Sequence, residues 1–380
     1  MMRINFADHK KPNLLVYGIT WREPRNVIFM HYLSSYFNIL VVTAGPVKNE
    51  LLELVKPAII RPLKFIFNDK IGFAVTPYIR NILKEFQPQF IFSIETHSFA
   101  AYHSIRMAAK LRAMSVIFTW QNVKTIPKLW IQKFIQKAIL KKSDFLIAGS
   151  IHSKYYLLNK GAEEKKIYII PETGYDRRIF LIKGDNLRNI WDYGSSDFVV
   201  LYSGRLVKEK GIEVILRVAK RIEHKLKNIK FAFVGTGPLK EKVETSDLTN
   251  VRYHGSYDFT DMGKVMRTCD LLIYPSISTK YWVEQFGYAP IEAVACGKPV
   301  VVSNSGALQF FINNEKNGTM ISEDSFESLE NAIILWFERW KSRLISVDTK
   351  NIDKYSAENI AKAYAEILLL SEKTKYKKNW

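Results

Sequence analysis

Two glutamates that stand eight residues apart indicate the chemistry of this chain. Glu284 precedes Phe286 and Gly287, and Glu292 lies inside the helix predicted to follow. A glycine near a helix start lets a bulky anion approach the backbone amides. Each carboxylate can then reach one side of a ligand held there, so the segment predicts a sugar-nucleotide site. The alternative is structural, with one glutamate capping the helix and the other solvated.

A second group of charged residues follows a predicted buried strand earlier in the chain. Gly204 and Arg205 begin this loop, Lys210 and Gly211 end it, and a helix is predicted over Ile212–Ile222. The guanidinium fork, the lysine point charge and the surrounding amides can hold a diphosphate. This is not a P-loop, because no Lys-Ser/Thr pair follows the glycines. An ordinary turn with solvated charges is the alternative.

Two further turns come after predicted strands. Gly235 and Gly237 lie in the turn Val234–Pro238, and Tyr257 ends the loop that begins at His254. Both turns are candidates for ligand binding, and the second could lie against a nucleotide base. Each could equally be plain turn chemistry, which glycine favours by itself.

Short apolar runs alternate with helical patterns along the chain. This alternation indicates parallel sheets covered by helices on both faces, whose ligands bind at the carboxyl ends of the strands. With two such sheets, the natural place for a ligand is the cleft between them. The predicted strands are Asn13–Gly18, Asn38–Thr43, Phe90–Glu95, Ser115–Thr119, Asp144–Ser150, Ile167–Pro171, Asp197–Gly204, Lys230–Gly235, Asp270–Pro275 and Pro299–Ser303. The predicted helices are Asn26–Phe37, Pro77–Phe86, Phe99–Leu111, Ile212–Ile222 and Tyr355–Leu370.

Length and composition predict two domains without a membrane span. At 380 residues the chain is too long for one ordinary core, and the polar stretch Lys183–Asn186 is the predicted linker. No uncharged apolar run reaches about 18 residues, and the N-terminal residues lack an apolar signal core. Cys269 and Cys296 predict buried thiols in a reducing compartment. No Cys/His cluster has zinc spacing, so no metal site is expected.

The net charge of +19 is unevenly distributed. Residues 1–182 hold 27 Lys and Arg against 12 Asp and Glu, a net charge of +15, which leaves +4 for the remainder. A basic half beside a nearly neutral half suggests that the first domain meets an anionic partner. A membrane surface, a nucleic acid and a polyanionic substrate all stay open.

The segment Lys124–Lys142 contains no acidic residue and mixes lysines with aromatic residues. This composition is typical of an interfacial helix on an anionic membrane surface, where each lysine contributes about 1 kcal/mol. The alternative is an ordinary domain helix with a buried apolar face and a solvated lysine stripe. On a helix, one face would hold Lys133, Lys137 and Lys141, and others would hold Trp130, Ile131, Phe134, Ile135 and Ala138.

Together these motifs resemble the donor-binding domain of the retaining glycosyltransferases of family 4, which have the GT-B fold. The family pattern runs Gly-Arg…Lys-Gly, Val-Gly-x-Gly-Pro, Gly, Pro-Ser and Glu-x-Phe-Gly-x4-Glu-Ala-x-Ala-x-Gly-x-Pro-Val. The chain matches these motifs in order at Gly204–Gly211, Val234–Pro238, Gly255, Pro275–Ser276 and Glu284–Val300. Five motifs in order are far more specific than any one of them. The match is weaker in the first domain, at Ser150, Tyr155 and Pro171–Phe180, with one extra residue between Pro171 and Gly174.

The resemblance implies an α/β protein with two Rossmann-like parallel-sheet domains that face a central cleft. Residues 1–182 would bind the acceptor, and residues 183–359 would bind the nucleotide-sugar donor. The C-terminal helix, residues 360–380, would cross back to the first domain.

The resemblance also implies a role for each matching side chain. Arg205 and Lys210 would neutralise the donor pyrophosphate and stabilise the charge on the leaving nucleotide. Glu292 would hold the ribose hydroxyls, and Glu284 would face the transferred sugar. Fixed cations aimed at a developing negative charge lower the barrier, so a bound metal would not be required.

Backbone groups and first-domain positions complete the implied site. The amides at Phe286–Gly287 would meet sugar or phosphate oxygens, and Gly306 would place amides near the distal phosphate. Gly18 stands where many family members have two glycines near the donor phosphates. His97 would face the sugar or the acceptor, although a lone histidine is often structural. The family's Thr-x-His appears here as Thr119–Gln121, which replaces a titratable ring with an amide.

The implied function is a retaining, metal-independent hexosyltransferase that moves a sugar from a nucleotide-diphosphate sugar to an acceptor hydroxyl. The acceptor would be a lipid-linked or cell-envelope glycan in polysaccharide or glycolipid biosynthesis. We expect the protein in the cytoplasm, attached peripherally to the inner face of the cell membrane.

Three other functions stay open at this point. Gln121 and the single Gly18 suggest a catalytically silent, sugar-nucleotide-binding partner subunit. The charge suggests a nucleic-acid-binding protein, although the chain has no RNP-type aromatic motif, helix-turn-helix signature or zinc site. A sugar-nucleotide epimerase with the same fold is the third.

Overall fold

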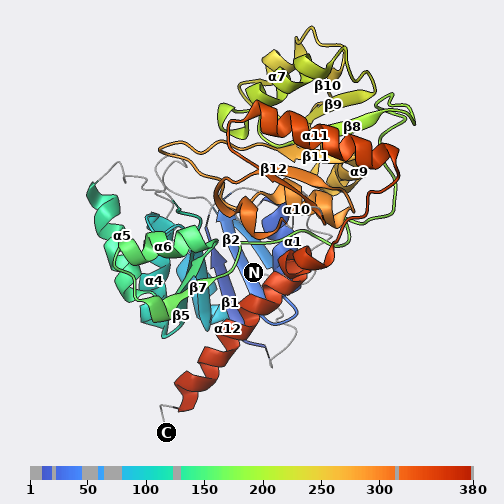
Figure 1. Ribbon diagram of the computed structural model, residues 1–380. Helices are drawn as coiled ribbons and strands as arrows, with labels where there is room; N and C mark the ends of the chain where they lie inside the picture. Colours follow the sequence, from blue (N-terminus) through green and yellow to red (C-terminus); the bar gives the residue numbers. More distant parts are fainter. Residues whose placement is uncertain are drawn as a thin grey trace. The chain divides into compact units, whose positions relative to one another are not determined.

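The computed structural model divides the chain into two compact units (Figure 1). It describes residues 11–18, 23–44, 59–63, 79–122, 130–312 and 316–377, with 44, 59–63, 79–81 and 371–377 as backbone only. The first unit comprises the residues up to Gly174 and the segment from Ala357 onward, and the second unit is Tyr175–Ser356.

The boundary between the units differs from the predicted one. It lies after Gly174 instead of after residue 182, and the returning segment starts at Ala357 instead of 360. The reason is that the two crossing segments pair with each other, through a β-bridge between Tyr175 and Ser356 and an ion pair between Arg177 and Asp353. The predicted linker around residues 183–186 lies inside the second unit.

The first unit is built on a seven-stranded parallel sheet in the order β3-β2-β1-β4-β5-β6-β7. Its strands are nearly continuous apolar runs because helices cover both faces. The strands are β1 Asn13–Tyr17, β2 Asn38–Ala44, β3 Ile59–Leu63, β4 Phe90–Ile94, β5 Met114–Thr119, β6 Phe145–Ala148 and β7 Ile167–Ile169. The described helices are α1 Pro24–Leu33, α3 Ile79–Phe86, α4 Phe99–Leu111, α5 Trp130–Lys142, α6 Ile151–Asn159 and α12 Ala357–Lys377, with the 3-10 turn η2 Glu164–Lys166.

Alternate side chains of these strands form separate cores on the two faces of the sheet. Leu14 and Val16 of β1 pack with residues of α1 and α12, whereas Leu15 and Tyr17 pack with residues of α3 and α4. This is the two-residue period of a strand. Helix α12 is fixed by Tyr364, whose ring meets Phe29 at 5.4 Å between centroids. The returning segment therefore completes the core of the first unit.

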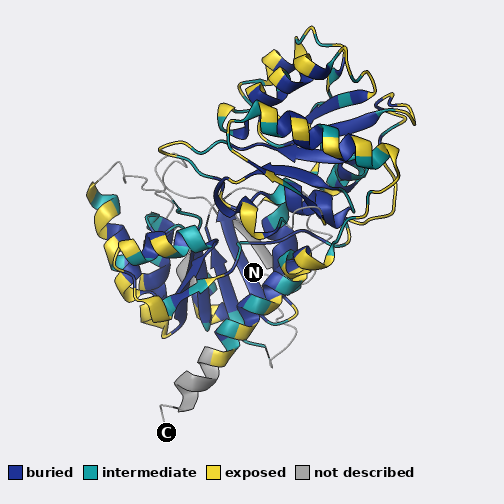
Figure 2. Cartoon of the chain, in the orientation of Figure 1, coloured by how far each residue is buried: buried dark blue, intermediate teal, exposed yellow. Residues whose placement is uncertain are grey.

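The second unit contains a six-stranded parallel sheet in the order β10-β9-β8-β11-β12-β13. Helix α11 packs beside α7, and α10 packs on β11 and β12. Figure 2 shows the central strands of each unit as buried. The strands are β8 Phe198–Ser203, β9 Ile229–Val234, β10 Val251–Tyr253, β11 Leu271–Tyr274, β12 Val300–Ser303 and β13 Gly318–Ile321. The helices are α7 Ile212–Ile222, α8 Lys240–Glu244, α9 Met262–Thr268, α10 Tyr288–Ala295 and α11 Phe326–Lys341, with the 3-10 turns η3 Lys208–Lys210, η4 Phe259–Asp261, η5 Gly306–Phe310 and η6 Lys350–Tyr355.

Three strands were absent from the sequence prediction, and all three lie at sheet edges. They are β3, β10 and β13. Strand β3 contains Pro62, and β10 has only three residues. Edge strands can be short and can tolerate proline because one side carries no ladder hydrogen bonds. Their sequences therefore lack the long apolar runs that mark the central strands.

Helix α5 presents a mixed aromatic and basic face. Trp130 is 78% exposed and Phe134 is 61% exposed, and both share the exposed side with the lysines. The prediction that aromatics and lysines lie on different faces is wrong for these two residues, which follow the same helical stripe as the lysines. Ile135, Ile139 and Leu140 are buried, as an ordinary domain helix requires. The first part of the basic segment, residues 124–129, lies outside the described residues.

Two other predictions can be compared with the structure. Cys269 and Cys296 are buried free thiols, and burial raises the pKa of each to about 12. Among the described helices, none combines the length and the apolar character needed to cross a membrane.

Candidate functional site

The loops at the carboxyl ends of β8 and β9 are joined by backbone hydrogen bonds. The Leu206 amide donates to the Thr236 carbonyl at 2.8 Å, and the Leu239 amide donates to the Leu206 carbonyl at 2.9 Å. Since β8 and β9 are neighbours in the sheet, their loops leave it side by side. The predicted diphosphate-binding loop that begins at Gly204 and the candidate turn that contains Gly237 therefore lie together.

Two of the predicted site glycines are required by close backbone packing. Gly235 has φ 132°, and a Cβ there would lie 1.9 Å from the carbonyl oxygen of Gly204. Gly306 has φ 54°, and a Cβ there would lie 2.0 Å from the carbonyl oxygen of Glu284. Only glycine fits such positions without strain. These glycines thus bring neighbouring loops together, whatever they contact in a ligand.

Lys210 and Glu284 form a buried ion pair. They lie 6% and 5% exposed, in the loop after β8 and the segment before α10. The Lys210 ammonium also donates to the Tyr274 hydroxyl at 2.7 Å and lies 4.8 Å from the centre of the Trp282 ring. We call Lys210, Glu284, Tyr274 and Ser276 the Lys210 cluster. Sequence reasoning found the first two but not their pairing, which joins residues 74 positions apart.

The Lys210 cluster holds the Glu284 carboxylate in one orientation. Ser276 donates to Glu284 Oε2 at 2.8 Å, and Lys210 donates to the same oxygen. Among the residues that the structure describes, no donor reaches Oε1, so this oxygen can accept from a ligand. Burial lowers the pKa of Lys210, which the attraction of Glu284 opposes. The ion pair thus holds the Glu284 carboxylate in one orientation and largely shielded from water.

Arg205 differs from Lys210 in its surroundings. Its side chain is exposed, and its guanidinium makes no hydrogen bond or ion pair with the described residues. Its carbonyl accepts from the Tyr202 hydroxyl at 2.7 Å, which fixes the backbone of the loop. The family resemblance implies the same role for Arg205 and Lys210, neutralisation of the donor pyrophosphate. In the structure Lys210 is already neutralised by Glu284, and Arg205 remains open to an anion.

Helix α10 begins at the predicted glycine. Gly287 has φ 80° and stands at the N-terminus of the helix, where no side chain caps the first amides. Glu292 lies 1% exposed within the helix. The Phe286 ring is buried against Tyr355 at 5.6 Å between centroids, so only its backbone could contact a ligand.

Tyr257 belongs to an aromatic cluster that sequence reasoning did not find. Its hydroxyl accepts from the Trp191 indole at 2.8 Å. The Trp191 ring stacks on His254 at 4.0 Å between centroids, and burial lowers the pKa of His254 to about 4. No spacing rule connects residues 191 and 257, since the fold alone brings them together.

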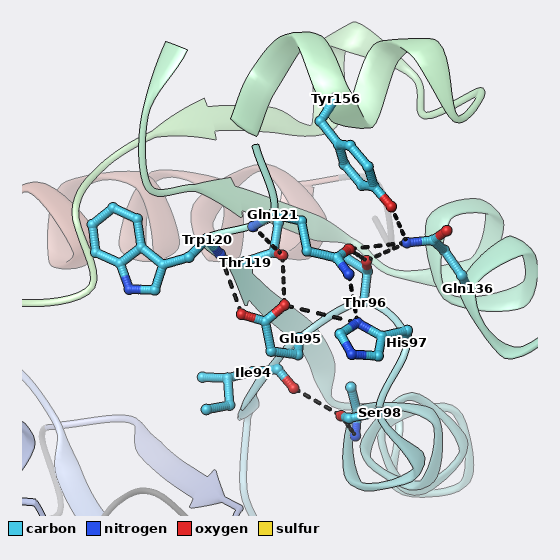
Figure 3. Close-up of polar contacts among 11 residues, drawn as sticks. Ile94, Glu95, Thr96, His97, Ser98, Thr119, Trp120, Gln121, Gln136 and Tyr156 are labelled. Atoms are coloured by element: carbon cyan, nitrogen blue, oxygen red, sulfur yellow. Dashed lines mark hydrogen bonds and ion pairs between the residues drawn. The ribbon is translucent and has the colours of Figure 1, made fainter. Parts of the chain in front are cut away.

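In the first unit, His97 lies beyond the carboxyl end of β4 within a hydrogen-bonded network (Figure 3). Its Nδ1 is 2.7 Å from Nε2 of Gln121, the residue that replaces the family's second histidine. The Gln121 carbonyl in turn accepts from Thr96 at 2.8 Å and from Gln136 at 3.0 Å. We call Thr96, His97, Gln121 and Gln136 the His97 network. Gln136 comes from α5, which was predicted either as a membrane-binding segment or as an ordinary domain helix, and not as part of a ligand site.

Two carboxyl groups near Trp120 were not predicted as site residues. The Trp120 amide donates to Glu95 at 3.3 Å, and its indole donates to Glu172 at 2.8 Å. Burial raises the pKa of both carboxyls, that of Glu172 to about 7. Gly149 leaves room for the Trp120 ring, because a Cβ there would lie 2.2 Å from it. Gly18 follows the last residue of β1, and the residues after it, 19–22, lie outside the described part of the chain.

The chain is similar in sequence to known glycosyltransferases. Residues 183–349 match the family model for glycosyl transferases group 1. An uncharacterized glycosyltransferase of Methanocaldococcus jannaschii is 27% identical over 208 residues, which are 51% of this chain and 56% of that protein. The N,N'-diacetylbacillosaminyl-diphospho-undecaprenol alpha-1,3-N-acetylgalactosaminyltransferase of Campylobacter jejuni is 24% identical over 219 residues, 56% of each chain. The chain spans about half the length of the curated relatives it matches.

The fold is shared with solved glycosyltransferase structures. HepE of Anabaena, solved in complex with UDP, has a TM-score of 0.72 over 94% of this chain and 99% of that chain, at 17% identity. This likeness confirms the predicted α/β fold of the GT-B class, with two Rossmann-like sheets. The match to the glycosyl transferases group 1 model lies within the second unit, which carries the Lys210 cluster and Arg205.

Proposed function

We propose that this protein is a retaining glycosyltransferase of family 4 that moves a sugar from a nucleotide-diphosphate sugar to an acceptor hydroxyl. The carrying observation is the Lys210 cluster, which orients a buried carboxylate, together with the exposed cation Arg205 in the same loop as Lys210. A sugar presents hydroxyl donors and a diphosphate presents anions, so this pair of groups suits both halves of the donor. The glycosyltransferase names of the relatives support the same reaction class.

The proposed reaction breaks the bond between the sugar and the diphosphate. Positive charge develops on the sugar, and negative charge develops on the leaving phosphate. Arg205 stabilises the leaving group, and the Gly287 and Gly306 amides add donors near its oxygens. Glu284 Oε1 accepts from a sugar hydroxyl, while Glu292 holds the ribose. Since protein cations and amides meet the phosphate charge, we propose that the reaction requires no metal.

Retention follows when the acceptor attacks the face from which the diphosphate leaves. The departing phosphate then takes the proton of the acceptor hydroxyl, so no strong protein base is needed. This agrees with the environment of His97, whose pKa is lowered by burial and whose Nδ1 faces an amide. The first unit, in this proposal, binds the acceptor.

We further propose that the acceptor is a lipid-linked or cell-envelope glycan at the inner face of the cell membrane. The Campylobacter relative is named for an acceptor on diphospho-undecaprenol. Helix α5 supplies a suitable surface, because Trp130 and Phe134 are exposed beside a row of lysines. Aromatic rings at the acyl boundary with lysines at the head groups favour reversible attachment to anionic lipid.

A thermal-shift screen with UDP-, GDP- and ADP-sugars tests donor binding, since a ligand of the native state raises the melting temperature. For the donor that binds, we expect Arg205→Ala to lower turnover by about 100-fold, the usual effect of losing one transition-state donor. Lys225→Ala is the matched control. This exposed lysine lies in the turn before β9, at the amino ends of the strands, whereas Arg205 lies at their carboxyl ends. Wild-type turnover in Arg205→Ala would contradict the site assignment.

Vesicle sedimentation tests the membrane surface. Replacing Trp130 and Phe134 by serine, or the α5 lysines by glutamate, should release the protein from vesicles of anionic lipid. Tyr155→Ser is the control for an exposed aromatic residue, since Tyr155 on α6 is 57% exposed. Binding that survives both sets of changes would refute attachment through α5.

The second candidate is a catalytically silent subunit that binds a sugar nucleotide. Gln121 favours it, because an amide stands where the family pattern has a titratable histidine. Donor binding in the thermal-shift screen, with neither hydrolysis nor transfer over any acceptor lipid, would support this candidate over the enzyme.

A further inference from the structure

The amide of Gln121 lies between two partners of different kinds (Figure 3). On one side its Oε1 is 2.8 Å from the Thr96 hydroxyl and 3.0 Å from Gln136 Nε2. On the other side its Nε2 is 2.7 Å from His97 Nδ1. Thr96 is fully buried and Gln136 is 5% exposed, so water does not substitute for these contacts.

The partners of Gln136 fix which way the Gln121 amide points. Gln136 Nε2 is within hydrogen-bond distance of three oxygens, those of Thr96 at 2.8 Å, Gln121 at 3.0 Å and Tyr156 at 3.2 Å. Turning the Gln121 amide over would place its NH2 group against the NH2 group of Gln136. When two donors face each other in a buried site, the hydrogen bond between the groups is lost. Both groups are then desolvated without an acceptor, which is energetically unfavourable. The Gln121 carbonyl therefore faces Gln136, and its NH2 group faces His97.

This orientation decides the tautomer of the imidazole. A donor facing Nδ1 requires a lone pair on that nitrogen, so the single proton of the neutral ring lies on Nε2. Burial is the main influence on the pKa of His97 and lowers it, which favours the neutral ring. The nearest carboxylate, Glu95, does not compete for Nδ1. Its Oε2 is 3.9 Å away and accepts from Thr119 at 2.9 Å.

We propose that Gln121 is a positioning residue that holds His97 as the neutral Nε2–H tautomer, so that His97 donates a hydrogen bond to a carbohydrate oxygen and does not act as a general base. The His97 side chain keeps 33% of its surface exposed, which leaves its free edge open to a ligand. The tautomer follows from the network alone. The carbohydrate partner rests on the proposed glycosyltransferase function.

Nitrogen-15 NMR of the histidine rings measures the tautomer without any substrate. The chain has seven histidines, and the His97 signals are identified by their loss in His97→Gln. We expect a protonated Nε2 and an unprotonated Nδ1 at neutral pH. A proton on Nδ1 would overturn the proposal, because the Gln121 carbonyl would then be the group that faces the ring.

Gln121→Glu reverses the polarity of this contact. A carboxylate only accepts, so it requires a proton on Nδ1 and favours the charged ring. We expect the His97 pKa to rise by about one unit or more in this variant. Gln136→Leu is the second variant: without the Gln136 donor, the Gln121 amide is free to turn, and the ring becomes a mixture of tautomers. Unchanged ring spectra in both variants would refute the positioning role of Gln121.

Substitutions of His97 separate a donor from a base. Glutamine keeps an N–H donor but cannot take a proton at neutral pH, whereas alanine removes both functions. We expect His97→Gln to retain at least about ten times the kcat/KM of His97→Ala, the value of one hydrogen bond of about 1.4 kcal/mol. Equal losses would refute the donor role. If the NMR result holds and no donor sugar is turned over at all, the proposed function fails and the tautomer assignment stands.

Discussion

Glu172 is a partly buried carboxyl whose ionisation should change the stability of the first unit. The Trp120 indole donates to it at 2.8 Å, and the Asn26 amide approaches it at 3.4 Å. Burial raises its pKa from 4.5 to about 7, assisted by the negative charge of Glu95 and opposed by these hydrogen bonds. The carboxyl is thus protonated in the folded protein over a pH range in which it is ionised in the unfolded chain.

The direction of the effect follows from linkage. The protonated form is favoured by folding, so its stabilising contribution is complete below pH 4.5 and is lost as the pH rises through about 7. The rise from 4.5 to about 7, at 1.36 kcal/mol per pKa unit, corresponds to about 3 kcal/mol in the free energy of unfolding. Glu172→Gln mimics the protonated form at every pH. We expect it to match the wild type near pH 4.5 and to be more stable by up to about 3 kcal/mol at pH 8.

Two measurements check this prediction. Guanidinium denaturation of both proteins between pH 5 and pH 8 gives the difference in unfolding free energy. In protein labelled with nitrogen-15 tryptophan, the Trp120 indole signal, identified with Trp120→Phe, should titrate with a midpoint near 7 in the wild type only. Glu366→Gln, an exposed carboxyl on α12, is the control and should not change the pH profile. An indole midpoint near 4.5, or a difference between the variants that does not grow with pH, would refute the reasoning.

Three further predictions concern the second unit. Lys210→Met should lower its free energy of unfolding by about 3–5 kcal/mol, because Glu284 is left as a buried unpaired charge, and adding Glu284→Gln should recover much of the loss in denaturation curves. Gly306→Ala should destabilise it by more than Gly255→Ala, since both glycines have positive φ but only the first has a backbone oxygen 2.0 Å from the added Cβ; equal melting temperatures would show that the loop adapts. Cys269 and Cys296, with pKa values raised to about 12 by burial, should resist thiol reagents in the native state and react only after denaturation.

Local sequence patterns predicted the central elements closely. Helices α4 and α7 begin and end at the predicted residues, and the central strands agree to within a few residues. These elements follow regular apolar periods because each helix packs one face, and each central strand packs both faces, against a core. Three of the four edge strands, β3, β10 and β13, and the boundary after Gly174 were not predicted, since they depend on partners distant in sequence.

The candidate site was predicted unequally in the two units. In the second unit, the motifs marked Arg205, Lys210, Glu284 and Glu292 as candidate donor-binding residues, and that role stays a prediction. The pairing of Lys210 with Glu284 was not predicted, nor was the Trp191–Tyr257 contact. In the first unit, neither Glu172 nor Gln136 belongs to a sequence motif that would have marked it as a site residue.

The sequence by itself determined the fold class, the family that the second unit resembles and the residue types that can meet a sugar and a diphosphate. These properties depend on local periodicity and on short motifs, which a single chain displays directly. Only the tertiary structure decided which cation is neutralised, which way the Gln121 amide points and where a carboxyl is buried beside Trp120. Those outcomes depend on burial and on hydrogen-bond partners brought together from separate strands, and desolvation then sets the charge and the tautomer of each group.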